Sequence, residues 1–232
     1  FSLFGRWAKS GYIKGTSMQS VSYFASVQKF FKKQNLALTI FGTPTKQGKA
    51  TAATQEAYDL AGTNFYNPNW GYQNGKIRNS RIEYRHQPTI ILTHEWQPSD
   101  KSNWMTSAGY SFGERSESSF DRNQNIDDPR PDYYKYLPSY LNDSDQVNMR
   151  EQLYNQLKAN PDLLQVNWDR IYDVNNNQDA VTINNVDGQG GSVTGKNSKY
   201  ILSNNVQYYN RFNLNSVYNI TVKNVDITAG VQ

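Results

Sequence analysis

The chain has 232 residues, of which 37% are hydrophobic and 14% aromatic, and it contains no cysteine. With a mean hydropathy of −0.81, no segment approaches the ~18 consecutive apolar residues that a membrane-spanning helix needs. The net charge of +4 is mild and the basic residues are scattered, which argues against nucleic-acid binding. One large all-β domain fits the length, and a membrane β-barrel remains open, because its strands need only about ten residues each.

Alternation of apolar and polar residues predicts a series of strands. In chain order, seven strands are expected at residues 1–9, 17–31, 36–40, 81–96, 104–113, 200–212 and 217–229. We expect a turn at 213–216, and a bulge near Lys223 and Asn224, where the apolar phase slips by one residue.

The hairpin at 81–113 shows the alternation most clearly. One face is apolar with aromatic ends and carries Ile82, Tyr84, His86, Pro88, Ile90, Leu92, His94 and Trp96, then Trp104, Thr106, Ala108, Tyr110 and Phe112. The opposite face is charged and hydroxylic, which fits lipid on one side of the sheet and a wet lumen on the other. Both histidines lie on the apolar face, so we assign them to membrane interfaces rather than to catalysis or zinc binding.

The connections between strands are strongly asymmetric. Short turns at 32–35, 97–103 and 213–216 fall on one side, whereas long loops at about 43–80 and 114–197 fall on the other, together with the short connection 10–15. Outer-membrane barrels have short periplasmic turns and long extracellular loops. A soluble β-sandwich with two large insertions is the alternative.

The expected fold is therefore an all-β, antiparallel transmembrane β-barrel, of which this chain forms a part. Seven strands with both chain ends inside strands cannot close, and unpaired strand edges are not tolerated in lipid. The polar lumen face suits a wide, plugged barrel of 22 strands. Short helices are expected within the long loops, at 54–61, at 146–159 and from Pro161 through Tyr172.

Two loop segments carry candidate binding residues. Tyr66, Trp70, Tyr72 and Asn74 interleave aromatic rings with amides, a pattern that can stack on and hold a sugar or a peptide. We favour the alternative in which Trp70 and Tyr72 pack the loop against its neighbours. The same two interpretations apply to a second aromatic group, which comprises Tyr133, Tyr134, Tyr136 and Tyr140.

A candidate metal site is formed by Asp173, Asn175, Asn177 and Asp179, which alternate as oxygen ligands do in calcium loops. However, Gln178 stands where such a loop needs glycine, and Asn184 stands where it needs glutamate, so we favour a polar loop that holds no calcium. The carboxylates of 121–132 lie in a proline-rich, solvated-looking run. No serine–histidine–aspartate group, phosphate loop or nucleotide fingerprint is present, and we expect no cofactor and no enzyme activity.

Several segments resemble the barrel of the Bacteroidetes-type TonB-dependent outer-membrane receptors, which include the starch-utilisation C-like transporters. They are 11–16 (GYIKGT), 41–62 (FGTPTKQGKATAATQEAYDLAG), 64–82 (NFYNPNWGYQNGKIRNSRI), 86–96 (HQPTIILTHEW), 128–140 (DPRPDYYKYLPSY) and 195–202 (GKNSKYIL). The resemblance covers most of the chain in consistent order and is weaker across 174–194.

The resemblance implies a bacterial outer-membrane location with extracellular loops, and a receptor of which residues 1–232 are an early section of the barrel. It implies a plug domain and a TonB box, neither of which lies in these residues. The implied partners are outer-membrane lipid, the plug and remaining barrel strands, the TonB energy-transducing complex and a surface lipoprotein lid. No substrate ligand can be carried over to a residue of this chain.

Three functions are weighed. The first is active import of a large nutrient, such as an oligosaccharide, a peptide or a metal chelate. The second is a receptor-like barrel that serves as a structural subunit of an outer-membrane secretion or assembly complex. The third is a secreted sugar-binding β-protein, which would bind glycan through the loop that contains Trp70 and Tyr72.

Overall fold

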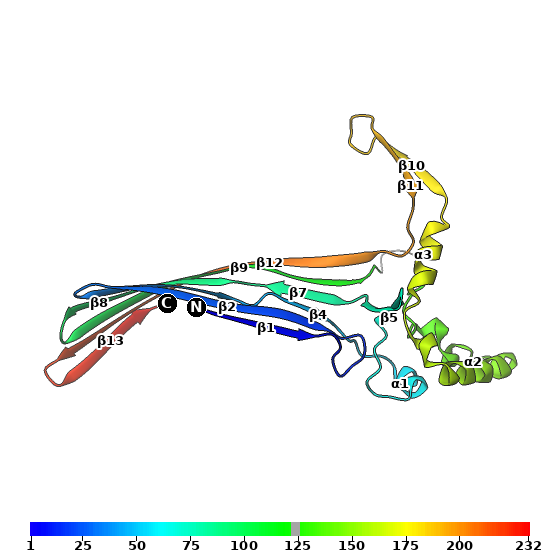
Figure 1. The fold of residues 1–232 in the computed structure, drawn as a ribbon, viewed down its shortest axis with the longest axis horizontal. Coiled ribbons are helices and arrows are strands. Elements are labelled where there is room, and N and C mark those ends of the chain that lie inside the picture. The colour runs from blue at the N-terminus through cyan, green and yellow to red at the C-terminus, as the bar shows by residue number, and fades with distance from the viewer. Residues whose placement is uncertain (122–125) are drawn as a thin grey trace.

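The computed structural model describes residues 1–121 and 126–232, and a long antiparallel sheet dominates it (Figure 1). The sheet contains β1 (Ser2–Ala8), β2 (Met18–Phe30), β3 (Gln34–Gly42), β4 (Thr45–Gly48), β7 (Ile82–His86), β8 (Thr89–Ser99), β9 (Ser102–Phe120), β12 (Leu202–Val222) and β13 (Val225–Val231). Two hairpins lie outside it, namely β5 (Trp70–Gln73) with β6 (Lys76–Asn79) and β10 (Ala180–Asn184) with β11 (Ser192–Lys196). The expectation of a mostly antiparallel β fold is confirmed. None of the helices in the described ranges is long and apolar enough to cross a membrane.

The nine strands of the sheet occupy seven rows. β3 and β4 both pair with β2, and β7 and β8 both pair with β9, without any change of register across either break. The breaks fall at Pro44 and Pro88, because proline has no N–H to give to the ladder. Their carbonyl oxygens still accept hydrogen bonds, from Val21 and Phe112, each at 3.1 Å. The number of rows agrees with the number of strands expected, and closure into a barrel stays a prediction.

The predicted turn at 213–216 was wrong. β12 runs without interruption for 21 residues, and the chain reverses at Lys223 and Asn224, where a bulge had been predicted. Asparagine is a common turn residue, which made 213–216 look like a turn. In the sheet, however, Asn213 and Asn215 lie opposite Gly109 and Ser107 of β9, so they continue the period-two pattern. Lys223 has a φ of +55°, as tight hairpin turns require.

Short and long connections gather at opposite ends of the sheet (Figure 1). The short ones are 31–33, 100–101 and 223–224, and those at the other end are 9–17, 49–81 and 121–201. Both long loops start later than the predicted 43–80 and 114–197, because β4 continues the row of β3 and β9 extends to Phe120. The predicted asymmetry itself is confirmed.

The two faces of the sheet differ in chemistry as predicted. Trp96 lies opposite Trp104, and Trp104 lies opposite Tyr218, with ring centroids 6.1 and 5.9 Å apart. By register, the face of these rings also presents Val27, Leu38, Leu92, Ala108, Tyr110, Phe112, Phe212 and Leu214, and we call it the apolar face. The opposite, polar face carries hydroxyl pairs such as Thr93 with Ser107, whose oxygens are 3.2 Å apart.

Burial separates the sheet from the loops. The buried hydrophobic side chains of the described residues are Ala57, Leu60, Tyr66, Trp70, Phe120, Leu137, Leu157, Leu164, Val166, Trp168 and Ile171. All of them lie in the long loops or at the loop end of β9, whereas Phe212 and Leu214 on the apolar face are 66% and 50% exposed. Among the described residues, the sheet therefore has no hydrophobic core of its own.

The long loops contain short helices. α1 (Gln55–Ala61) is capped by Thr54, whose hydroxyl accepts a hydrogen bond from the Ala57 N–H at 3.3 Å. α2 (Val147–Ala159) follows the 3-10 turn η3 (Ser144–Gln146), and α3 is Trp168–Asn176. The remaining 3-10 turns are η1 (Tyr134–Tyr136), η2 (Pro138–Tyr140) and η4 (Pro161–Leu164). The helices expected at 54–61 and 146–159 are confirmed, whereas the third was wrong in its start, because only a 3-10 turn follows Pro161.

Candidate functional site

The two long loops fold together into one unit, which we call the loop assembly: residues 49–81 and the described part of 121–201. One small core is formed by Ala57, Leu60, Tyr66, Leu137, Leu157 and Leu164, and a second by Phe120, Val166, Trp168 and Ile171. The Val166 N–H donates to the Trp70 carbonyl at 2.9 Å. A Cβ at Gly71 would lie 1.9 Å from the Val166 carbonyl oxygen, so only glycine permits this approach.

The structure divides the four predicted ligand-binding residues. Tyr66 is buried in the first core, and Trp70 is only 5% exposed. Tyr72 contacts Trp70 edge-on at 5.5 Å and is 45% exposed. Asn74 has a φ of +50° and forms the two-residue turn between β5 and β6. Only Tyr72 and Asn74 are thus placed to meet a ligand, and their binding of one stays a prediction.

The neighbouring amides are occupied by backbone groups. The Asn67 side chain donates to the Lys14 carbonyl at 3.1 Å, and Asn79 donates to the carbonyls of Gly15 at 2.9 Å and Lys49 at 2.8 Å. These bonds tie the 9–17 connection to the loop assembly. The pattern of amides and aromatic rings that suggested sugar binding therefore has a structural use, which favours the packing interpretation.

The proline-rich run of 121–132 is less solvated than the sequence suggested, and its residues 122–125 lie outside the described part of the chain. Asp128 accepts hydrogen bonds from the Arg130 guanidinium at 2.8 to 3.1 Å. Burial would lower the pKa of Arg130, but the hydrogen bond to Asp128 and the charge of Asp132 outweigh it and raise the pKa. Burial also raises the pKa of Tyr66 far above its usual range. In the described part of this run, Asp128 is therefore engaged in holding the Arg130 guanidinium.

The tyrosines that follow form an exposed aromatic cluster. Tyr133 contacts Tyr134 and Tyr136 with ring centroids 4.7 and 5.4 Å apart, and Tyr134 contacts Tyr140 at 5.5 Å. Tyr134 is 56% exposed and Tyr140 is 49% exposed. The structure thus brings these residues together on the surface of the loop assembly, where flat rings are available for stacking contacts.

The predicted calcium ligands fall on and after a helix. Asp173 and Asn175 lie in α3, where residues two apart point about 200° away from each other. The Asn175 amide is already bonded to the backbone N–H and carbonyl of Tyr200, both at 2.9 Å. Asn177 ends the helix, and Asp179 lies beyond it. Among the described residues, no three histidine, aspartate or glutamate side chains gather as a metal site would require.

A charged network lies on the polar face at the loop end of the sheet. Glu83 lies opposite Glu117, and Arg85 lies opposite Arg115, arrangements that would repel across a ladder. The repulsion is relieved diagonally: Glu83 pairs with Arg115 at 2.9 Å, and Arg81 pairs with Glu117.

The ion-pair partners of Glu83 determine the direction in which its pKa is shifted. Lys49 adds a second ion pair with this carboxylate, at 3.3 Å. Burial alone would raise the pKa of Glu83, but the hydrogen bonds from Arg115 and Lys49 hold it below its usual range. Sequence reasoning missed this network, although the spacing of Glu83, Arg85, Arg115 and Glu117 on opposed arms contained the signal.

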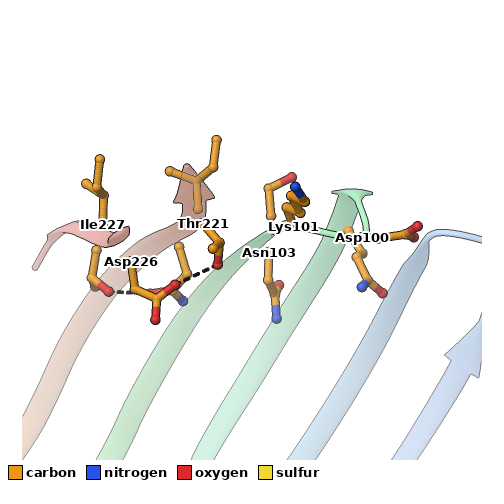
Figure 2. Close-up of a pocket in the computed structure, with 11 residues that line it drawn as sticks. Asp100, Lys101, Asn103, Thr221, Asp226 and Ile227 are labelled. Atoms are coloured by element: carbon orange, nitrogen blue, oxygen red, sulfur yellow. Dashed lines mark hydrogen bonds between the residues drawn. The ribbon is translucent and has the colours of Figure 1, made fainter. Parts of the chain in front are cut away.

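A polar pocket of about 400 Å³ lies at the opposite, short-turn end of the sheet (Figure 2). Lys101 lies in the turn before β9 and Asn103 lies at the start of β9, while Thr221 and Asp226 flank the last turn. The Thr221 hydroxyl donates to the Asp226 carboxylate at 2.7 Å, and the Thr221 N–H donates to the Lys101 carbonyl at 2.8 Å. These bonds join neighbouring turns, so the pocket is explained by turn architecture.

Both histidines lie on the apolar face, as predicted. His86 Nε2 is 3.0 Å from the Tyr23 hydroxyl, and His94 Nε2 is 3.1 Å from the Gln34 side-chain oxygen. Each imidazole therefore has a neutral side chain as its partner: Gln34 comes from the adjacent row, whereas Tyr23 of β2 reaches His86 across the row of β3 and β4. Their placement at separate levels of the sheet leaves them apart from each other and from the charged network of Glu83.

No family model, no curated protein and no solved structure matches this chain. Functional inference therefore rests on the geometry. The structure combines an amphipathic sheet, a folded loop assembly at one end of that sheet and an exposed aromatic cluster.

Proposed function

We propose that the chain is part of a TonB-dependent outer-membrane β-barrel that actively imports a large nutrient, such as an oligosaccharide, a peptide or a metal chelate. The observation that carries this proposal is the sheet itself. One face is apolar and exposed, the other is hydroxylic and charged, and the connections are short at one end and long at the other. Lipid on the first face and water on the second account for all three features.

The height of the apolar band fits a bilayer. From Trp104 to Phe112 the apolar face of β9 advances eight residues, or about 27 Å along the strand. At the strand tilt of about 35–45° found in outer-membrane barrels, this length gives a height of about 20 Å, close to their apolar band of about 25 Å, which is flanked by aromatic rings. Beyond Phe112 the same face carries Glu114, Ser116 and Ser118. The polar extension of β9 would then leave the hydrocarbon region, pass through the headgroup layer and support the loop assembly.

The outer edges of the sheet support a larger barrel. In the described residues, β1 pairs only with β2, and β13 pairs only with β12. Each unpaired backbone group in lipid costs several kcal/mol, so both edges require further strands. We propose that the remaining strands of the same receptor supply them, and that a plug fills the wide lumen.

The absence of cysteine allows a direct test of the two faces. In the protein in its native membrane, single Ser107→Cys and Ala108→Cys variants would each carry a nitroxide label. These neighbours lie on the polar and apolar faces of β9. We expect the ratio of oxygen to nickel-chelate accessibility to be severalfold higher at position 108. Equal ratios, or a higher ratio at position 107, would contradict a lipid-facing apolar face.

The folded loop assembly also favours a second candidate, a structural subunit of an outer-membrane secretion or assembly complex, because its cores and exposed tyrosines suit protein docking.

A measurement of nutrient uptake distinguishes the transporter from the structural subunit. Cells with and without the protein would be given labelled maltooligosaccharides, oligopeptides and a ferric chelate, each with and without a protonophore. Import requires at least one probe to enter only with the protein and only with the proton gradient. If none does while the protein copurifies with other outer-membrane subunits, the scaffold replaces the transporter.

A further inference from the structure

A basic cleft of about 750 Å³ opens where the apolar face meets the loop assembly. Its floor is made by side chains from four adjacent rows, one each from β4, β7, β9 and β12: Lys46, Ile82, Ser118 and Leu202. By register, these four residues share the face of Trp96 and Trp104. The β5–β6 hairpin and the 9–17 connection supply the walls.

The charge of the cleft has one sign. Lys9, Lys46, Lys76 and Arg78 line it, and no carboxylate of the described residues does. None of the four forms an ion pair with a described residue. The polar face at the same level is different, because Lys49 and Arg115 both form ion pairs there with Glu83. Four cations are thus collected on the apolar side without a counter-charge.

Arg78 is held in place by neutral groups. Its guanidinium donates to the Gln73 side-chain oxygen at 2.8 Å and to the Tyr172 hydroxyl at 2.9 Å, and it stacks over the Trp168 ring at 4.0 Å. The hydrogen bond from Arg78 is the main reason why the pKa of Tyr172 is lowered. The guanidinium is therefore positioned in advance while its positive charge stays uncompensated.

The floor of the cleft begins at an aromatic level of the apolar face. Trp7 lies opposite Gln19, Gln19 lies opposite Lys46, and Lys46 lies opposite Tyr84. Lys46 thus lies at the same level of the sheet as two aromatic side chains, Trp7 and Tyr84, of the type that mark a membrane interface. At this level a bilayer presents lipid headgroups, and below it the apolar face would contact acyl chains.

We propose that this cleft binds the phosphate of an anionic lipid headgroup, with the acyl chains of that lipid lying along the apolar face. This proposal rests on the membrane location proposed above. Lysine and arginine donate charge-assisted hydrogen bonds to phosphate, and basic pockets at the ends of membrane-spanning segments recognise such headgroups. The apolar floor formed by Ile82 and Leu202 favours a lipid over a free phosphate ion.

The test uses the purified protein reconstituted in phosphatidylcholine vesicles with spin-labelled phosphatidic acid or spin-labelled phosphatidylcholine. The ratio of their association constants is obtained from the motionally restricted fraction. The Lys9→Gln, Lys46→Gln and Lys76→Gln triple variant removes three charges from the cleft and leaves the stacked Arg78 intact. Its matched control is Lys29→Gln, Lys33→Gln and Lys101→Gln, which removes three charges at the short-turn end.

We expect the wild type and the control to prefer phosphatidic acid at least about fivefold, and the cleft variant to lose this preference. The proposal would be overturned if both triple variants preferred phosphatidic acid over phosphatidylcholine to the same degree. Full release of labelled phosphatidic acid by equimolar inorganic phosphate would show a site for a soluble anion and would also overturn it. If neither lipid were restricted, the membrane location itself would fail, an outcome distinct from loss of selectivity alone.

Discussion

Replacing Trp168 by alanine is expected to unfold the loop assembly while the sheet remains paired. Trp168 is 2% exposed, its ring packs on Phe120 with centroids 5.6 Å apart, and its indole N–H donates to the Arg78 carbonyl at 3.3 Å. Truncating a buried tryptophan costs about 3–5 kcal/mol, because burial is lost and a cavity remains. The second core contains few other large side chains, so little of this cost can be recovered by repacking.

Hydrogen exchange of the α3 amides measures this effect, and limited proteolysis within 126–201 provides a second readout. Local opening that is easier by about 3–5 kcal/mol accelerates exchange by two to four orders of magnitude. Leu163→Ala is the matched control, because Leu163 precedes the same helix but is 48% exposed. Trp168→Phe keeps an aromatic ring in the second core but loses the indole N–H and part of the ring volume, so we expect a smaller effect than for Trp168→Ala.

Trp168→Ala also removes the ring on which Arg78, a lining residue of the basic cleft, stacks. If α3 amides exchanged at the same rate in Trp168→Ala and in the wild type, the second core would not stabilise the assembly. If Leu163→Ala had an effect as large as Trp168→Ala, general sensitivity of the loop would explain both, and the assigned role of Trp168 would be wrong.

The sheet was largely predictable because its signal is local. Each residue alternates with its neighbour, so His94 and Trp96 could be assigned to one face without knowledge of any partner strand. The error at 213–216 has a local cause as well. Asparagine favours turns, but in this sheet Asn213 and Asn215 belong to a wet face, where a polar side chain satisfies the strand pattern.

The sites were harder to predict because they depend on contacts between distant segments. Arg78 meets Trp168 across 90 positions and Tyr172 across 94, and Lys46 lines the same cleft as the β5–β6 hairpin, which belongs to the loop that follows it. Neither contact has a periodic signature. The candidate calcium site was based on the alternation of Asp173 and Asn175, which brings their side chains to one side only in an extended loop. In the structure both residues lie in a helix, where their side chains point apart.

Leu214→Arg is expected to prevent stable membrane assembly, whereas Asn215→Arg on the next residue of β12 is expected to be tolerated. Leu214 lies on the apolar face opposite Ala108, four positions from the level of Tyr218 and four from the level of Phe112, and Asn215 lies on the polar face opposite Ser107. An arginine on the lipid side near the bilayer midplane costs about 2–4 kcal/mol, while a lumen position carries no such penalty.

Both variants add the same charge and the same side chain to one strand, so only the face differs. The measurements are the amount of folded, heat-modifiable protein in the outer membrane and its urea midpoint. We expect Leu214→Arg to lose most of the folded protein, with a lowered midpoint, and Asn215→Arg to stay near the wild type. Equal losses would mean that β12 tolerates no arginine on either face. If the Asn215→Arg protein alone were lost, the two faces of the sheet would have to be exchanged, with lipid on the side that carries Thr93 and Ser107.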